Sequence, residues 1–340
     1  MKELFGSGPV IVVELGINHR GDLDYAKHLC LLASSAGAKF VKNQTHIPDA
    51  EMSPEATSVV PPGQEASIFE IIKENSMSMD DEIRLKEYCD SLGLTYFSTP
   101  FSVEAAHFLE DLGVPLFKVG SGECDNFALL EFLVRTGKPL IVSTGMRALR
   151  DIEEQLEFLV STVKDLAILE TTNSYPCSPH SVSLGGIREL KTKFPEIPIG
   201  YSDHTVGMAF VYAALGAGAG VIEKHFTDDL NAQGPDIKGS MDVSMLAELV
   251  KLAPEISASL ARNKSLKAAE HGVLEFARGT LCAAVDLVEG TTLCKEHVTS
   301  KRPGTGDFFW SDLDNILGAT MLSSVKAGNR FLRHHFVKSD

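Results

Sequence analysis

The sequence has no long hydrophobic run and no paired-cysteine motif, and it carries no excess of basic residues. No apolar stretch reaches the roughly 18 residues that a membrane-spanning helix requires. The N-terminus, MKELFGSGP, lacks the apolar segment typical of a signal peptide. We therefore expect a cytoplasmic protein that does not bind membranes.

The cysteines and the net charge each exclude a class of protein. The six cysteines include no C-x-x-C pair, which indicates neither a zinc knuckle nor a disulfide framework, so we expect reduced thiols. The formal net charge of −15 argues against a nucleic-acid-binding protein, because such proteins need basic faces that neutralise phosphate. An anionic substrate would need local lysines.

One unit repeats along the chain: a short β-branched strand, a polar tip, then an amphipathic helix with acids in its first turn and glycine just past its end. The predicted strands are 10–16, 38–44, 94–100, 116–122, 139–145, 166–173, 197–203 and 221–227. Eight alternating units favour a (β/α)₈ TIM barrel over an open doubly wound sheet, although the periodicity by itself fits both.

The composition and periodicity of the sequence change after the last predicted barrel helix. We assign residues 1–262 to the barrel and the charged, weakly periodic segment 263–275 to a linker. Residues 276–340 show short strands and turns, which predict a small, mainly β domain. So short a segment is expected to lack a core of any size unless it packs on another surface.

Polar residues recur where the predicted strands end. In a TIM barrel these carboxyl ends converge on one mouth, where the active site lies. The residues in question are Glu14, Lys42, Gln44, Ser98, Lys118, Ser121, Ser143, Asn173, Ser202, His204, Glu223 and His225. The sequence therefore predicts a polar site at the barrel mouth.

Two histidines follow neighbouring strands, His204 in SDHT and His225 in EKHFT. Either one alone is as readily a core or capping histidine as a ligand. As a pair at one rim they could hold a divalent metal ion, and nearby Asp203 and Glu223 could orient an imidazole or a metal-bound water. This pattern favours a Lewis acid that polarises a carbonyl group.

Three lysines project from predicted strands, Lys42, Lys118 and Lys224. Each could neutralise a phosphate or carboxylate, or form a Schiff base as in one class of aldolase. The turns at 120–122 and 143–145 offer backbone amides and hydroxyls suited to phosphate oxygens. Any one of these glycines could simply close a tight turn, but the set together outlines an anion pocket.

Ten motifs in order give the chain a resemblance to a known family. They are VELGINHRGD, VKNQTH, FSTPFS, FKVGSGE, VSTGM, TTNSYP, GYSDHT, EKHFTD, GPDIKGSM and KRPGTGDF. Together they resemble the bacterial sialic acid (N-acetylneuraminate) synthases, whose C-terminal SAF domain is similar to type III antifreeze proteins. The resemblance implies condensation of phosphoenolpyruvate with an N-acylated hexosamine, a divalent metal (Mn²⁺, with Mg²⁺ or Co²⁺ as alternatives) and a domain-swapped homodimer.

The same resemblance implies roles for individual residues. It makes His204 and His225 the metal ligands, and Glu14 and Glu223 the groups that activate water and transfer a proton, without deciding which does which. The positions matching phosphoenolpyruvate contacts are Lys42, Lys118, Ser121, Ser143, Asn173 and Ser202. The positions matching sugar contacts are Gln44, Tyr175, Asp236 and Arg302.

The acceptor sugar stays open at this point. Gly63 or Gln64 stands where some members have a sugar-binding asparagine, while KNQTH and DAEMSPEA are closer to the N-acetylneuraminate-forming members. N-acetylmannosamine is the first choice, and a 2,4-diacylamino hexose of the legionaminic or pseudaminic type is the alternative. Two alternative functions from other classes of protein are a class I Schiff-base aldolase and a non-catalytic carbohydrate-binding protein.

Overall fold

A computed structural model describes residues 8–61 and 65–336 of the chain. Two compact units make up the chain, residues 1–262 and residues 263–340. Gly63 and Gln64, the positions expected to bear on the acceptor, lie outside the described ranges. None of the described helices combines the length and the apolar character needed to cross a bilayer.

The first unit is a closed barrel of parallel strands. Each strand pairs with the next in sequence order, and the last pairs with the first. The strands are β1 (Val10–Glu14), β2 (Phe40–Thr45), β3 (Thr95–Pro100), β4 (Phe117–Val119), β5 (Leu140–Ser143), β6 (Leu166–Thr171), β7 (Ile199–Asp203) and β8 (Val221–His225). The predicted TIM-barrel fold is confirmed.

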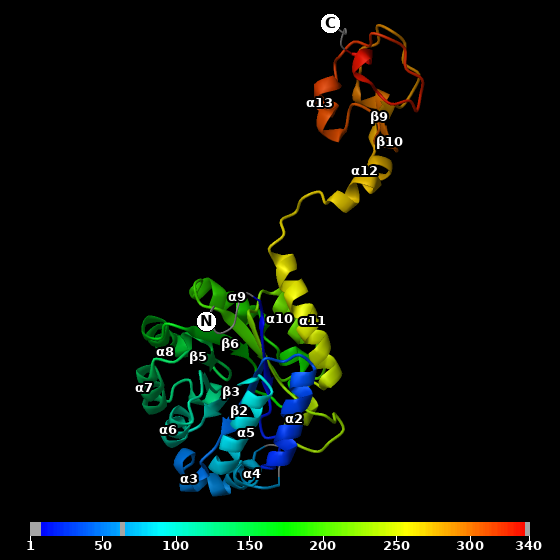
Figure 1. Ribbon diagram of the computed structural model, residues 1–340. Helices are drawn as coiled ribbons and strands as arrows, with labels where there is room; N and C mark the ends of the chain where they lie inside the picture. Colours follow the sequence, from blue (N-terminus) through cyan, green and yellow to red (C-terminus); the bar gives the residue numbers. More distant parts are fainter. Residues whose placement is uncertain (1–7, 62–64, 337–340) are drawn as a thin grey trace. The chain divides into compact units, whose positions relative to one another are not determined.

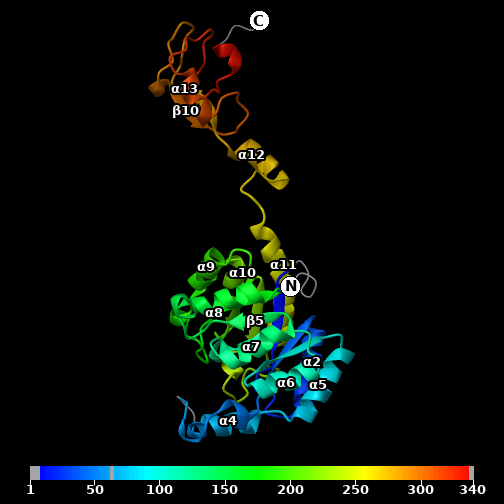
Figure 2. The same cartoon turned by 90° about the vertical axis from the view of Figure 1, so that its left-hand side faces the viewer.

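Helices surround this barrel (Figure 1, Figure 2). They are α2 (Leu23–Ser35), α3 (Pro48–Glu51), α4 (Ile68–Asn75), α5 (Met79–Ser91), α6 (Val103–Asp111), α7 (Phe127–Thr136), α8 (Leu149–Thr162), α9 (Leu184–Lys193), α10 (Ala209–Gly216) and α11 (Val243–Leu260), with short 3₁₀ turns η1 (Pro54–Ser58), η2 (Ser121–Glu123), η3 (Pro179–Ser181) and η4 (Ile237–Gly239). Several begin at a polar cap: the side chains of Asp22, Ser102 and Asp242 each accept a hydrogen bond from a backbone N–H in the first turn.

Side chains alternate along each strand between the barrel interior and the surrounding helices. Val10, Val12 and Val221 belong to a small apolar cluster inside the barrel, whereas Val13 and Ile222 pack in the large cluster formed with the helices. Interior positions change from apolar to charged toward the carboxyl ends of the strands. On β8, Val221 is followed on the same side by a glutamate and a histidine, so the chemistry gathers at the mouth.

This alternation overturns three expectations from the sequence. Ser98 does not line the mouth, because its hydroxyl lies 2.6 Å from that of Thr45 on the helix-facing side. Lys224 is no anion ligand: its Nζ donates to Asp203 Oδ2 at 2.5 Å and to the Thr205 carbonyl at 2.8 Å. Asp203 therefore pairs with a lysine and orients neither histidine.

The second unit has its own apolar core. Its elements are η5 (Ala268–Glu270), α12 (His271–Ala277), β9 (Thr280–Ala283), η6 (Lys295–His297), β10 (Val298–Lys301), η7 (Trp310–Asp312), α13 (Leu313–Ile316) and η8 (Arg333–His335), with β9 and β10 antiparallel. Leu281, Leu313 and Phe331 are among the buried residues of that core. A small apolar core therefore lies within the unit itself, and the expected linker 263–275 includes η5 and part of α12.

The buried Lys224–Asp203 pair predicts a large stability effect. Both side chains are fully buried, so Lys224→Met leaves Asp203 with its hydrogen bonds from Tyr201 and Thr205 but without a counter-ion, which should cost about 3–5 kcal/mol of unfolding free energy. Lys86→Met is the matched control on the same unit, because Lys86 pairs with a half-exposed Asp90 on α5 and should cost at most about 1 kcal/mol. Urea unfolding measures both, and equal losses would contradict this account.

Candidate active site

A polar cavity of about 130 Å³ lies at the carboxyl end of the barrel. The predicted residues that line it are Glu14, Lys42, Gln44, Lys118, Ser121, Ser143, Asn173, Tyr175, Ser202, His204, Glu223 and His225. Gly120 and Gly122, from the turn expected to receive an anion, line it too. Thr99, Phe101 and Thr171 also line it, and the sequence analysis missed them. Thr99 could have been found by applying strand alternation to β3, where it has the same orientation as Phe97.

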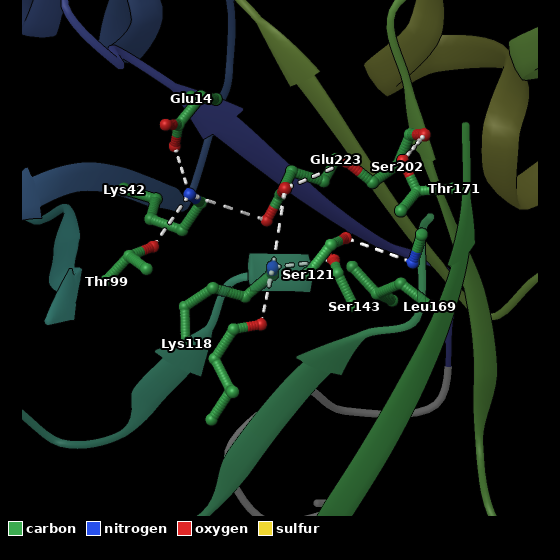
Figure 3. Close-up of polar contacts among 12 residues, drawn as sticks. Glu14, Lys42, Thr99, Lys118, Ser121, Ser143, Leu169, Thr171, Ser202 and Glu223 are labelled. Carbon is green, nitrogen blue, oxygen red and sulfur yellow. Dashed lines mark hydrogen bonds and ion pairs between the residues drawn. The ribbon is translucent and has the colours of Figure 1, made fainter. Parts of the chain in front are cut away.

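Two lysines and two glutamates form the centre of the cavity (Figure 3). Lys42 Nζ lies 2.6 Å from Glu14 Oε2 and 3.8 Å from Glu223 Oε2. Lys118 Nζ lies 3.7 Å from Glu223 Oε1. All four side chains are buried, so each charge depends on the others for stabilisation.

Burial and pairing act in opposite directions on these groups. Burial disfavours the charge on Lys42, but Glu14 and Glu223 outweigh it and raise the pKa of that lysine. For Lys118 burial prevails: although Glu223 favours the charged form, the pKa of Lys118 falls to about 8. Burial would also raise the pKa of Glu223, yet Lys118 and Lys42 together lower it well below its usual range.

Hydroxyl groups complete the shell around the charges. Lys42 donates to Thr99 Oγ1 at 3.0 Å, and Lys118 donates to Ser143 Oγ at 2.7 Å. Ser202 Oγ donates to Glu223 Oε1 at 2.9 Å. These contacts hold the ammonium groups toward the cavity, which is the arrangement an anion-binding site needs.

Asn173 and Ser121 meet beside a glycine at the same mouth. Ser121 Oγ accepts from the Gly145 backbone N–H at 3.0 Å. A Cβ at Gly145 would lie 1.8 Å from Asn173 Oδ1 and 2.9 Å from Ser121 Oγ. The buried Asn173 Oδ1 has no hydrogen-bond partner among the described residues. Any side chain at position 145 would collide with Asn173 and Ser121. The amide oxygen of Asn173 is left without a hydrogen-bond donor among the described residues.

The two histidines are close and fit a metal ion. Their ring centroids lie 5.7 Å apart. His204 Nδ1 lies 2.9 Å from the Thr172 carbonyl, so Nδ1 carries the proton and Nε2 has a free lone pair. His225 Nδ1 is buried without a hydrogen-bond partner among the described residues. Burial and the neighbouring His225 lower the pKa of His204 to about 4, which keeps its ring neutral, as metal ligation requires.

The described residues contain no group of three or more His, Cys, Asp or Glu side chains that could hold a metal ion. A metal at the two histidines would therefore take its remaining ligands from water or substrate, which leaves positions open for catalysis. The two imidazole side chains are the part of such a site that the chain itself provides.

Gly16 makes room for His225. Its φ is +54°, in the left-handed region that favours glycine. A Cβ there would lie 2.7 Å from His225 Cε1 and 3.3 Å from Asp236 Oδ2. Asp236 itself is buried, with Oδ2 at 3.8 Å from His225 Nδ1, so it lies next to the predicted metal ligand.

Arg302 belongs to the second unit. It directly follows β10 and is exposed within that unit. Its predicted role as a sugar contact stays a prediction.

The titration of Lys118 should respond in opposite directions to two neighbouring substitutions. Its midpoint lies near pH 8, because burial lowers the pKa to about 8. Glu223→Gln removes the opposite charge and should lower the midpoint, whereas Lys42→Met removes a like charge and should raise it. The ¹³Cε shifts of labelled lysine, assigned with Lys118→Met, measure this. Shifts in the same direction would contradict the charge arrangement.

Comparison with known proteins assigns the chain to a family. Residues 29–265 match the NeuB family, and residues 278–332 match the SAF domain. The N,N'-diacetyllegionaminic acid synthase of Legionella pneumophila is 34% identical, covering 96% of this chain and 94% of that protein. The human N-acetylneuraminate-9-phosphate synthase is 31% identical over 93% and 89%.

A solved structure gives the same assignment. The N-acetylneuraminic acid synthetase of Leptospira borgpetersenii, in complex with citrate, superposes with a TM-score of 0.69 at 30% identity and covers 79% of this chain and 91% of its own. The chain therefore belongs to the NeuB family of sialic acid-type synthases, carries a SAF domain after its barrel, and is an enzyme of the phosphoenolpyruvate-dependent transferase type.

Proposed function

We propose that this enzyme condenses phosphoenolpyruvate with N-acetylmannosamine and water, giving N-acetylneuraminate and phosphate. A 2,4-diacylamino hexose of the legionaminic or pseudaminic type is the alternative acceptor. The observation that carries the proposal is the mouth itself, where two buried lysines, two glutamates and two histidines surround one cavity. We place the reaction in the cytoplasm, and we expect no nucleic-acid or membrane partner.

Phosphoenolpyruvate would bind through the lysines and the hydroxyl shell. Its phosphate and carboxylate would pair with Lys42 and Lys118, helped by Ser121, Ser143, Asn173 and Ser202. These anionic groups would replace the glutamates as partners of the lysines. Because Lys118 and Lys42 lower the pKa of Glu223 in the free protein, the exchange raises the proton affinity of that carboxylate and makes it a competent base.

The two glutamates would then manage the protons. C3 of phosphoenolpyruvate forms a bond to the aldehyde carbon of the open-chain sugar, and water adds to C2. One carboxylate takes the proton that this water loses, and the other delivers a proton to the aldehyde oxygen, which becomes a hydroxyl. The C2–O bond to phosphate then breaks while the new C2 hydroxyl gives its proton to the departing phosphate, which leaves the 2-keto acid. Glu14 and Glu223 share these roles in an order that kinetics must assign.

His204 and His225 would hold the divalent metal, with Mn²⁺ first and Mg²⁺ or Co²⁺ as alternatives. When bound, the ion supplies Lewis-acid polarisation of the acceptor's aldehyde group. Around it, Gln44, Tyr175 and Asp236 would contact the sugar. The ring of Tyr175 lies 4.3 Å from that of His204, centroid to centroid, which places an aromatic face beside the same site.

A class I aldolase is the second candidate, because the lowered pKa of Lys118, about 8, would suit an imine-forming lysine. Membership of the NeuB family weighs against it, since addition to phosphoenolpyruvate needs no imine. Borohydride reduction in the presence of substrate would trap an imine on Lys118, whereas the proposed synthase should lose no activity to borohydride.

The direct test is phosphate release from phosphoenolpyruvate against a panel of 2-acylamino hexoses with Mn²⁺ present. We expect release with N-acetylmannosamine, or with a 2,4-diacylamino hexose if the alternative holds. Release with none of the panel would refute the proposed function and would favour a non-catalytic sugar-binding protein.

Metal dependence is measured in the same assay. Chelation, His204→Ala or His225→Ala should each reduce turnover at least about a hundredfold, because polarisation of the carbonyl is lost. Bound Mn²⁺, counted by atomic absorption, should fall in both variants while circular dichroism stays unchanged. Full metal occupancy with normal turnover in either variant would exclude that histidine as a ligand.

We also propose a domain-swapped homodimer in which Arg302 reaches the acyl group of a sugar bound in the partner's barrel. Glu14→Ala and Arg302→Ala homodimers should each be inactive. Mixing them one to one should restore about a quarter of wild-type activity, because half of the dimers carry one intact site out of two. If Arg302 acts within its own chain, no mixed site is intact and the mixture stays inactive.

A further inference from the structure

A chain of hydrogen bonds runs from the rim of the barrel to Glu14. Gln44 Nε2 donates to Glu14 Oε1 at 2.8 Å. Gln44 Oε1 lies 3.2 Å from His46 Nε2, and His46 Nδ1 lies 3.0 Å from both carboxylate oxygens of Glu51. The side chains of His46 and Glu51 are 4% and 6% exposed, so water does not replace these contacts.

The donors and acceptors along this chain fix the orientation of the Gln44 amide. Glu14 Oε2 is taken by Lys42 at 2.6 Å, and Oε1 accepts from Gln44. Reversing the Gln44 amide would set its oxygen against a carboxylate oxygen of Glu14, which is repulsive. Gln44 Oε1 must therefore face His46, and both ring nitrogens of His46 face acceptors. Nε2 therefore donates its proton to Gln44, and Nδ1 shares a proton with the Glu51 carboxyl group.

Packing holds the His46 ring in this position. It stacks on Phe101, with centroids 4.2 Å apart and planes 14° from parallel. Phe101 lines the cavity, as does Gln44. The ring therefore contacts two residues that line the site without lining the cavity itself.

We propose that His46 is a positioning residue: paired with Glu51, it locks the Gln44 amide so that one N–H holds Glu14 and the second N–H is presented to the acceptor sugar. This inference rests on the proposed function and deepens it. An amide fixed in this way offers the acceptor a hydrogen-bond donor, so it would recognise an oxygen of the sugar, either a hydroxyl or an acyl carbonyl. With the amide free to rotate, that discrimination is lost.

A double-mutant cycle separates this role from simple packing. His46→Phe keeps a ring on Phe101 and removes both hydrogen bonds. We expect it to lower kcat/KM for the acceptor about tenfold or more in the wild-type background, as expected for a lost hydrogen bond to a charged group. In a Gln44→Ala background the same substitution should change kcat/KM less than about twofold, because its target is gone. Equal losses in both backgrounds would overturn the proposal.

His107→Phe is the matched control. His107 on α6 also packs against a phenylalanine, Phe132, with ring centroids 4.2 Å apart, but it lies on the exposed side of its helix and outside the cavity. It should leave acceptor kinetics unchanged. Thermal unfolding of each variant shows whether the fold is retained.

A spectroscopic measurement tests the contact between His46 and Gln44 directly and needs no turnover. In ¹⁵N-labelled full-length protein, Nε2 of His46 should show the shift of a protonated nitrogen, because it donates to the Gln44 oxygen. An unprotonated Nε2 on wild-type His46 overturns the inference even if the enzyme is active. Absence of phosphate release with every acceptor would refute the proposed function instead. The NMR result would still show whether His46 holds the Gln44 amide.

Discussion

Alternation of side chains along parallel strands is the constraint on which the rest of this structure depends. In each strand one set of residues faces the barrel interior and the other faces the helices. On β8 this places Glu223 and His225 in the mouth and sends Lys224 outward to Asp203. A register shift of one residue would turn Lys224 into the mouth and Glu223 and His225 toward the helices. The buried Lys224–Asp203 pair therefore also stabilises the register of the two strands that each histidine ends or follows.

The sequence was sufficient for the barrel and for most of the mouth, because both follow from strand periodicity and from where strands end. It was insufficient where the direction of a side chain, into the barrel or toward the helices, had to be decided. Ser98 and Thr99 are adjacent and chemically alike, and nothing in their identity says which one enters the cavity. For the same reason, the sequence suggested site roles for Lys224 and Asp203, which lie beside the two histidines. In the structure they form a buried ion pair with each other.

Other features needed coordinates because they depend on contacts between distant segments. Gly16 and His225 are far apart in sequence, and only their approach shows why the position excludes a side chain. The orientation of the Gln44 amide follows from partners on β1, on the segment after β2 and on α3. In the second unit, apolar residues, many of them leucines, come from short strands and turns and gather into one cluster, which a count of strands does not reveal.

The pairing of Lys42 and Lys118 with glutamates bears on how products leave. An anion that enters must compete with Glu14 and Glu223, so it gains only the difference between two pairings. In the proposed reaction, a molecule with a phosphate and a carboxylate would displace both glutamates at once. Inorganic phosphate carries a single anionic group and would displace only part of the set, so the carboxylates would return to their lysines as the C–O bond breaks. Under that proposal, the resting salt bridges would favour phosphate release and limit product inhibition.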